Sequence, residues 1–200
     1  MPATTQRVKC EVGVKTWTQA ILYVVNNVFR VWLIILQQRG LNNEILLRDK
    51  ETLNKGLFTW LTTHHLNKAI LEVFETGKSE AAERWDLIFT YKDPTQEDIS
   101  GAEDANKVWK TYLDEVSAFM KRLNALPSGT TYRVVVSLNS DVEGQSPPEV
   151  PGWSSTTLKD VTHLNNMKFG EPIIQSGGLI TTNMEFWGGI PDSNKHDVTY

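Results

Sequence analysis

Residues 68–91 read KAILEVFETGKSEAAERWDLIFTY, and this stretch predicts two antiparallel strands joined by a turn. Residues 68–76 are rich in β-branched and aromatic side chains, and the Gly77-Lys78 pair that follows is typical of a turn. Residues 83–91 then alternate strictly between large apolar and polar side chains. This alternation predicts a half-buried strand, with one face in a core and the other in water.

Three helices are expected around this hairpin, over residues 14–39, 50–65 and 102–126. In the first, apolar side chains cover most faces, which is typical of a helix buried on several sides. Gly40 is placed to end that helix with a left-handed cap. Ser100 and Glu103 form a capping box that predicts the start of the third helix.

The longest apolar run, residues 21–36, lies inside the first helix. It contains Asn26, Asn27 and Arg30, and it is shorter than the roughly 20 apolar residues that a bilayer span needs. We therefore expect a core helix rather than a membrane segment.

Composition and charge narrow the class of protein. The 200-residue chain is 40% apolar and 22% charged, which suits one domain with a full core. Its formal net charge of −4 disfavours a role that depends on phosphate contacts with nucleic acid. The lone Cys10 can form no internal disulfide, and the polar, basic residues 1–9 lead into no signal peptide. We therefore expect a cytoplasmic protein that binds neither nucleic acid nor a membrane directly.

Motifs that carry chemistry are missing from the sequence. It has no glycine-rich phosphate loop and no Gly-x-Ser-x-Gly nucleophile elbow. His64 and His65 are adjacent, and neighbouring helical residues point about 100° apart, so they cannot easily share a metal ion. We expect no catalytic residue, metal or cofactor, and a binding protein rather than an enzyme.

Residues 130–139 form the strongest predicted strand, and the chain changes character after them. The even-numbered side chains from Tyr132 to Leu138 alternate with the odd-numbered set, so one set should meet the helices. Beyond Asn139, glycine, proline and polar residues separate short apolar stretches. Two explanations remain open: a few edge strands with long loops, or a segment that packs in more than one way or around something else.

Three landmarks stand in a characteristic order: LQQRG at residues 36–40, GLFTWLTT at residues 56–63, and AERW at residues 82–85. With them the chain resembles the HORMA domain, the fold of spindle-checkpoint and meiotic-axis proteins and of bacterial antiphage relatives. The proline-rich stretch up to Trp153 and the stretch NMEFW at residues 183–187 also fall in family order. The short connection between the second helix and the hairpin resembles the bacterial branch.

The resemblance implies an α+β fold, with three helices packed on one face of an antiparallel sheet and a C-terminal safety belt. The expected divisions are a core at residues 1–139 with a mobile leader at 1–12, a safety belt at 140–187, and a flexible tail at 188–200. In such proteins the belt wraps a short closure-motif peptide that adds a strand to a sheet edge. In the bacterial branch the implied partners are a cGAS/DncV-like nucleotidyltransferase, an AAA+ remodelling ATPase and a second HORMA protein, in CBASS antiphage operons.

We expect the peptide at the edge of residues 130–139, because a long exposed edge is an aggregation hazard unless it is covered. The expected peptide-binding residues are Arg133, Val135, Ser137, Asn139, Trp153 and Phe169. Phe186 and Trp187 are expected to pack the belt, and Gln6, Arg7 and Lys9 to form a handle for the remodelling ATPase.

Two functions remain open at this point. The first is a peptide-binding conformational switch that, once closed, binds and activates the nucleotidyltransferase. The second is a structural adaptor with a static belt, whose own tail is the peptide captured by a sibling HORMA protein.

Overall fold

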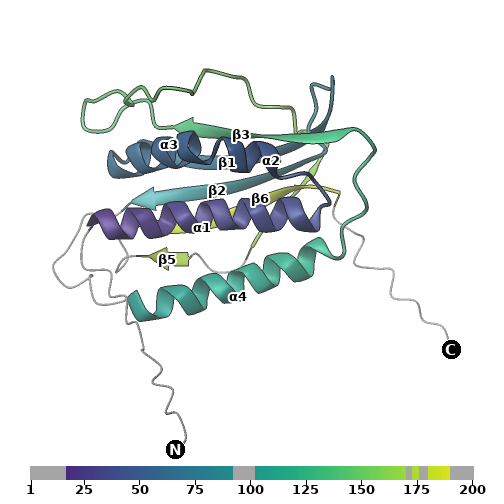
Figure 1. The fold of residues 1–200 in the computed structure, drawn as a ribbon, viewed down its shortest axis with the longest axis horizontal. Helices are drawn as coiled ribbons and strands as arrows, with labels where there is room; N and C mark the ends of the chain where they lie inside the picture. Colours follow the sequence, from purple (N-terminus) through teal and green to yellow (C-terminus); the bar gives the residue numbers. More distant parts are fainter. Residues whose placement is uncertain (1–16, 92–101, 170–172, 176–179, 190–200) are drawn as a thin grey trace, which may run out of the picture.

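The structure, a computed structural model, describes residues 17–91, 102–169, 173–175 and 180–189. Four helices and six strands lie in this part of the chain (Figure 1). In chain order they are α1 (Trp17–Gln38), α2 (Glu44–Arg48), α3 (Lys50–Thr62), β1 (Leu66–Glu75), β2 (Glu83–Tyr91), α4 (Ala102–Met120), β3 (Thr130–Leu138), β4 (Asn165–Lys168), β5 (Ile173–Gln175) and β6 (Ile180–Gly188).

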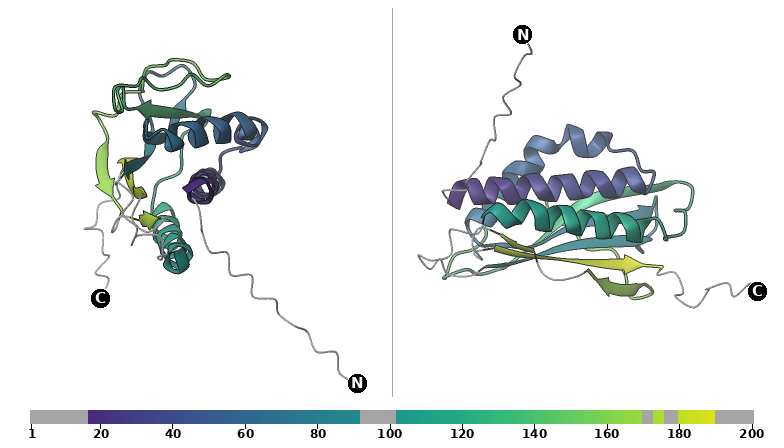
Figure 2. Two further views of the ribbon diagram at one scale, coloured as in Figure 1. Left: turned by 90° about the vertical axis from the view of Figure 1, so that its left-hand side faces the viewer. Right: turned by 90° about the horizontal axis from the view of Figure 1, so that it is seen from below.

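The strands form one antiparallel sheet in the order β3-β1-β2-β6-β4, and β5 also pairs with β6. The helices gather on one face of this sheet, as the right-hand view of Figure 2 shows. The expected α+β architecture is therefore confirmed. The order also leaves β3 at one edge, which matters for the site described below.

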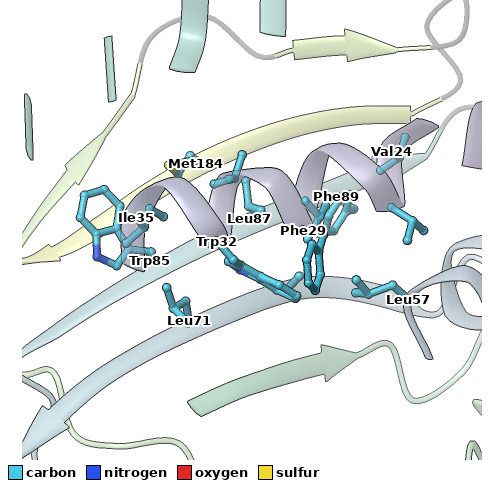
Figure 3. Packing of buried hydrophobic residues seen from close by; sticks show 14 of the residues in the cluster. Val24, Phe29, Trp32, Ile35, Leu57, Leu71, Trp85, Leu87, Phe89 and Met184 are labelled. Atoms are coloured by element: carbon cyan, nitrogen blue, oxygen red, sulfur yellow. The ribbon is translucent and has the colours of Figure 1, made fainter. Parts of the chain in front are cut away.

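Helix α1 is the central helix of the core. Ile21, Trp32 and Ile35 on it are completely buried, and side chains from α1 and the strands point toward one another between the two layers (Figure 3). Burying each side chain of this size stabilises the fold by about 1.5–3 kcal/mol. By length and composition alone Thr18–Gln38 could cross a membrane, but 61% of its most apolar window is buried within the protein. This burial supports a core helix.

The predicted cap at Gly40 is confirmed. Gly40 adopts a φ of 70°, in the left-handed region. Its N–H donates to Gln37 O, and the N–H of Leu41 donates to Leu36 O at 2.8 Å. This pair of bonds satisfies carbonyls that the end of α1 would otherwise leave unpaired.

The β1–β2 hairpin is also confirmed, with Gly77 at a φ of 85° in its turn. The expected water-facing side of β2 is present at Thr90 but not at Arg84 and Asp86, which are both buried. Arg84 Nε donates to Asp86 Oδ1 at 2.9 Å, and Lys68 Nζ lies 3.2 Å from Asp86 Oδ2. Because these charges are paired on the side of the sheet away from the helices, the strand can bury both faces.

Several helices differ from the expected ones. Helix α3 ends at Thr62 rather than residue 65, so His64 and His65 lie beyond it. Helix α4 ends at Met120 rather than residue 126, where tight turns replace the helical bonds: Arg122 N–H donates to Phe119 O and Leu123 N–H to Met120 O. Helix α2 was not expected, because its five residues are too few to show a helical period.

The C-terminal third contributes an edge strand, β4, as one of the two explanations expected, and also an inner strand, β6. Strand β6 lies between β2 and β4, and its burial alternates strictly along nine residues. The polar Thr182 is one of its inward residues, so the apolar alternation is interrupted in the sequence. The predicted capping box, leader and most of the tail lie outside the described residues.

Candidate functional site

The outer edge of β3 has no strand partner among the described residues. Hydrogen bonds at the two ends of the β1–β3 pair show which backbone groups of β3 face β1. At one end Thr76 N–H donates to Gly129 O, and at the other end Asn139 N–H donates to His65 O. Bonding alternates along an antiparallel pair, so the odd-numbered residues of β3 point their backbone groups at β1. The backbone groups of Tyr132, Val134 and Val136 therefore point outward.

The chain returns along this edge after β3 (Figure 1). We name residues 140–163 the belt segment. No backbone hydrogen bond joins it to the outer edge of β3, although both lie within the described part of the chain. The edge is thus covered without being paired.

Two tryptophans attach the belt segment to α3. Trp60 Nε1 donates to Pro148 O at 2.8 Å, and Trp153 Nε1 donates to Thr52 O at 3.1 Å. The two rings meet edge to face, with centroids 5.0 Å apart. Gly56 makes room for this contact, because a Cβ there would lie 2.4 Å from Trp153 Nε1.

The belt segment then crosses to the face of the sheet away from the helices. There Arg133 Nη1 donates to Thr156 Oγ1 at 3.1 Å, and Arg133 Nη2 to Thr157 O at 2.6 Å. Arg133 is itself held by the buried Glu72, whose second oxygen accepts the N–H of Lys159 at 2.8 Å. The segment is therefore fixed at both faces and spans the edge between them.

Two neighbouring cavities lie between the edge of β3 and the belt segment. The larger, of about 820 Å³, is bounded by Trp60, by β3 and by residues 147–156. The smaller, of about 490 Å³, is bounded by α2, the start of α3, β3 and residues 152–156. Val134, Val135 and Trp153 line both. Together the cavities follow the outward-pointing backbone of β3.

The charges around these cavities are mostly paired. The hydrogen bond from Arg48 lowers the pKa of Asp49, which keeps this carboxylate at the smaller cavity ionised. Burial raises the pKa of Tyr132, so its hydroxyl stays protonated while it accepts the N–H of Leu46 at 3.0 Å. In the described residues, Glu149 at the larger cavity has no hydrogen-bond or ion-pair partner for its carboxylate.

Of the residues expected to bind peptide, three line the cavities: Arg133, Val135 and Trp153. Ser137 and Asn139 do not line them. Asn139 instead donates through Nδ2 to His64 O, toward the start of β1. The odd-numbered residues of β3 direct their backbone groups at β1, so the main-chain groups free to pair with an added strand belong to the even-numbered residues.

Phe169, another residue of the expected peptide-binding set, is buried in the core. Its ring lies 5.2 Å from that of Phe119 and 6.1 Å from that of Trp85, two strands away from β3. Phe186 is buried against Trp85 with centroids 4.4 Å apart, and Trp187 packs under the Arg84 guanidinium. Gln6, Arg7 and Lys9 lie outside the described residues.

Trp60, Pro148 and the outward backbone of Val134 and Val136 were not expected at the site. Trp60 and Gly56 both belong to the GLFTWLTT landmark at residues 56–63, so the signal was present in the sequence. This landmark indicated the family, but it did not predict that Gly56 and Trp60 contact the belt segment.

No cluster of metal-ligating side chains occurs in the described residues. The buried carboxylates there are occupied: Glu72 by Arg133, Glu83 by Arg39, and Asp86 by Arg84. Paired in this way, these groups are structural rather than arranged as an acid and a base. The arrangement at β3 is suited to holding an extended chain.

Two of the three landmarks that carried the resemblance meet in space. Arg39 of LQQRG makes two bonds to Glu83 of AERW, from Nε at 3.1 Å and from Nη2 at 2.6 Å. Arg39 Nη2 also donates to Asn124 O, beyond α4. The pair therefore joins the end of α1, the start of β2 and the loop that leads to β3.

Several solved structures share this fold. A Caenorhabditis elegans HTP-2 bound to HTP-3 closure motif 1 matches with a TM-score of 0.69 at 15% identity, over 94% of this chain and 98% of that one. A chain of the mitotic checkpoint complex matches with a TM-score of 0.66 at 14% identity, over 83% and 96%. A chain of the Escherichia coli MS115-1 CdnC:HORMA-deltaN complex matches with a TM-score of 0.51 at 9% identity, over 87% and 90%.

At these identities the likeness establishes the fold. Comparison with the sequences of curated proteins gives no match. The family model of bacterial HORMA domain 2 matches residues 9–188, nearly the whole chain. This chain belongs to the bacterial HORMA domain 2 family.

Proposed function

We propose that this protein is a peptide-binding conformational switch of bacterial antiphage defence. Closed around a closure-motif peptide, it binds and activates a cGAS/DncV-like nucleotidyltransferase in the cytoplasm. An AAA+ ATPase reopens it and releases the peptide. The proposed role needs no cofactor and no catalytic residue of its own.

One observation carries the proposal: the outer edge of β3 is covered by the belt segment but not hydrogen-bonded to it. An added strand would gain main-chain hydrogen bonds at Val134 and Val136, and the belt segment would then lie across it. The cavities of about 820 Å³ and 490 Å³ provide room along this line for backbone and several side chains.

Two of the related structures support the proposal by what they contain. HTP-2 is bound to a closure motif of HTP-3, and the E. coli HORMA protein is in a complex with CdnC. A switch also needs a segment whose two packings differ by only a few kcal/mol. The belt segment fits this need, because a few side chains and an isolated Glu80–Asp160 bridge hold it rather than a long ladder.

A matched pair of proline variants tests the peptide edge. Val136→Pro removes an outward N–H, whereas Val135→Pro removes an N–H that points at β1, and proline is tolerated on edge strands where its missing donor faces away. With a peptide selected from a library, we expect V136P to keep its unfolding midpoint and lose at least about tenfold in affinity. We expect V135P to destabilise the protein. Unchanged peptide binding by a folded V136P would contradict the proposal.

The nucleotidyltransferase provides the second test. The purified enzyme from the same operon should form a complex with the peptide-loaded protein and gain activity, while protein without peptide should not activate it. A static adaptor predicts a different outcome, in which no peptide changes the protease sensitivity of the belt segment and activation does not depend on peptide.

A further inference from the structure

We infer that the peptide is an extended segment with apolar side chains toward α3, polar side chains on its other side, and a basic residue beside Glu149. This inference rests on the proposed function and adds the chemistry of the ligand. It follows from the different walls that the larger cavity presents to the two sides of an added strand.

The wall on the helix side is apolar. The even-numbered side chains of β3 point to this side, and Val134, Val136 and Leu138 pack against the core only in part. Trp60 and Trp153 complete the wall. Side chains of an added strand lie beside those of its neighbour on the same face, so every second peptide residue should be apolar.

The opposite wall is polar apart from Val135, whose side chain lies on the far face of the sheet. Ser154, Ser155 and Thr156 line the larger cavity where the belt segment passes from α3 to the far face of the sheet. All three are exposed. Successive side chains of a strand point to opposite faces, so the remaining peptide residues meet hydroxyl groups. Polar or small side chains suit this side.

Among the described residues that line the larger cavity, the one charged side chain is acidic. Glu149 lies between Pro148 and Val150 in its lining, is exposed, and has no partner within the described residues. A lysine or arginine of the peptide would find an unpaired carboxylate there, and an acidic residue would be repelled. Exposed ion pairs are weak, so the preference should be about two- to fivefold.

The test begins with a peptide selected from a random library on the full-length protein. Alanine replacement along that peptide should weaken binding at alternate positions, by about tenfold or more at apolar positions and less than about threefold between them. Sensitivity at every third or fourth residue would indicate a bound helix and overturn the inference.

Charge reversal tests the place of the basic residue. A lysine-to-glutamate change in the peptide should weaken binding to the wild-type protein about two- to fivefold, and Glu149→Lys should abolish or reverse this difference. Glu143→Lys is the control, because Glu143 is exposed in the same segment but does not line either cavity. An unchanged preference in E149K, or an equal change in E143K, would overturn the inference.

The outcomes separate the two claims. Peptides that bind at β3 without the alternating pattern or the basic residue refute this inference and leave the proposed function intact. Failure of every peptide in the library to bind refutes the proposed function and the inference with it.

Discussion

Arg39 and Glu83 form the ion pair on which three parts of the chain converge. Their side chains are each only 6% exposed, and the closest N–O distance between them is 2.6 Å. A buried pair of this kind is not a large source of stability by itself, because removing both charges from water is costly. Each charge of the pair lowers the free-energy cost of burying the other.

Replacing Arg39 alone should therefore lower the free energy of unfolding far more than replacing Arg39 and Glu83 together. We expect Arg39→Met to lower the free energy of unfolding by about 3–5 kcal/mol, because it leaves the Glu83 carboxylate buried without its partner. The double variant R39M/E83Q should recover much of this loss. Urea denaturation of the wild type, R39M, E83Q and R39M/E83Q measures these free energies of unfolding. Equal destabilisation in R39M and in the double variant would contradict the pairing.

Glu83 should also give the protein a particular pH dependence. Burial raises its pKa above the ordinary 4.5, an effect that outweighs the opposing hydrogen bond and charge of Arg39. As pH falls, the folded protein takes up this proton before the unfolded chain does, so its contribution to stability is greatest at low pH and declines as pH rises through the folded-state pKa. The unfolding free energy of the wild type minus that of Glu83→Gln should therefore decrease from about pH 4 to about pH 7. A difference that increases over this range would show that the Arg39 interaction outweighs burial.

Among the elements, α3 has a role beyond packing on the core. It buries Leu57 and Leu61 in the core and presents Gly56 and Trp60 to the belt segment. The missing side chain at Gly56 is what lets Trp153 approach. A glycine inside a helix costs about 1 kcal/mol relative to alanine, and here that cost accompanies a specific contact.

Filling the space at Gly56 should release the belt segment. A Cβ there would lie 2.4 Å from Trp153 Nε1 and 2.9 Å from the Trp60 ring, so Gly56→Ala displaces Trp153 while its helix propensity offsets part of the cost. We expect faster proteolysis within residues 140–163 and faster peptide release, with a small change in the unfolding midpoint. Limited proteolysis with mass spectrometry identifies the cut sites. Lys55→Ala, on the exposed side of α3, is the control; if both variants are cut at the wild-type rate, Trp153 does not hold the segment.

At the scale of the whole molecule, the belt segment joins the two faces of the sheet around one edge. It is bound to α3 on the helix side and to Glu72 and Arg133 on the other. Strand β6, which follows it in the chain, is fixed between β2 and β4 at the opposite side of the sheet. The belt segment is also held at the β1–β2 turn, where Ala81 N–H donates to Asp160 O at 2.9 Å. Opening the segment therefore requires the loss of attachments at several separate places, which is consistent with the proposed external remodelling.

Residues 1–9, outside the described residues, are the proposed handle for that activity. Polar terminal segments that bury little surface are readily engaged by other proteins. Deletion of these residues should leave peptide affinity within about twofold of the full-length value and abolish opening driven by the proposed AAA+ ATPase partner. Release of a labelled peptide with ATP measures this, and equal release from the truncated and full-length proteins would exclude the handle.

Local sequence determined the three longer helices, the hairpin and the strand at β3, because these depend on periods and caps within a few residues. The apolar run of α1 and the alternation before Tyr91 are of this kind, and so is Gly40. The resemblance of the landmarks added the family and the edge at which a peptide would bind. In β6 the polar Thr182 occupies an inward position, so the sequence there lacks the apolar alternation that predicts a strand.

Only the tertiary structure decided which groups face the site. The pairing with β1 points the backbone of Val134 and Val136 outward, and no property of β3 alone shows its partner. Trp60 meets Pro148 across 88 positions of sequence, and Arg133 meets Glu72 across 61. Phe169 entered the core because Trp85 and Phe119 converge on it from other elements. The sequence determined each strand and helix through neighbouring residues, whereas the site arises from long-range contacts that become visible only once the sheet has an order and a register.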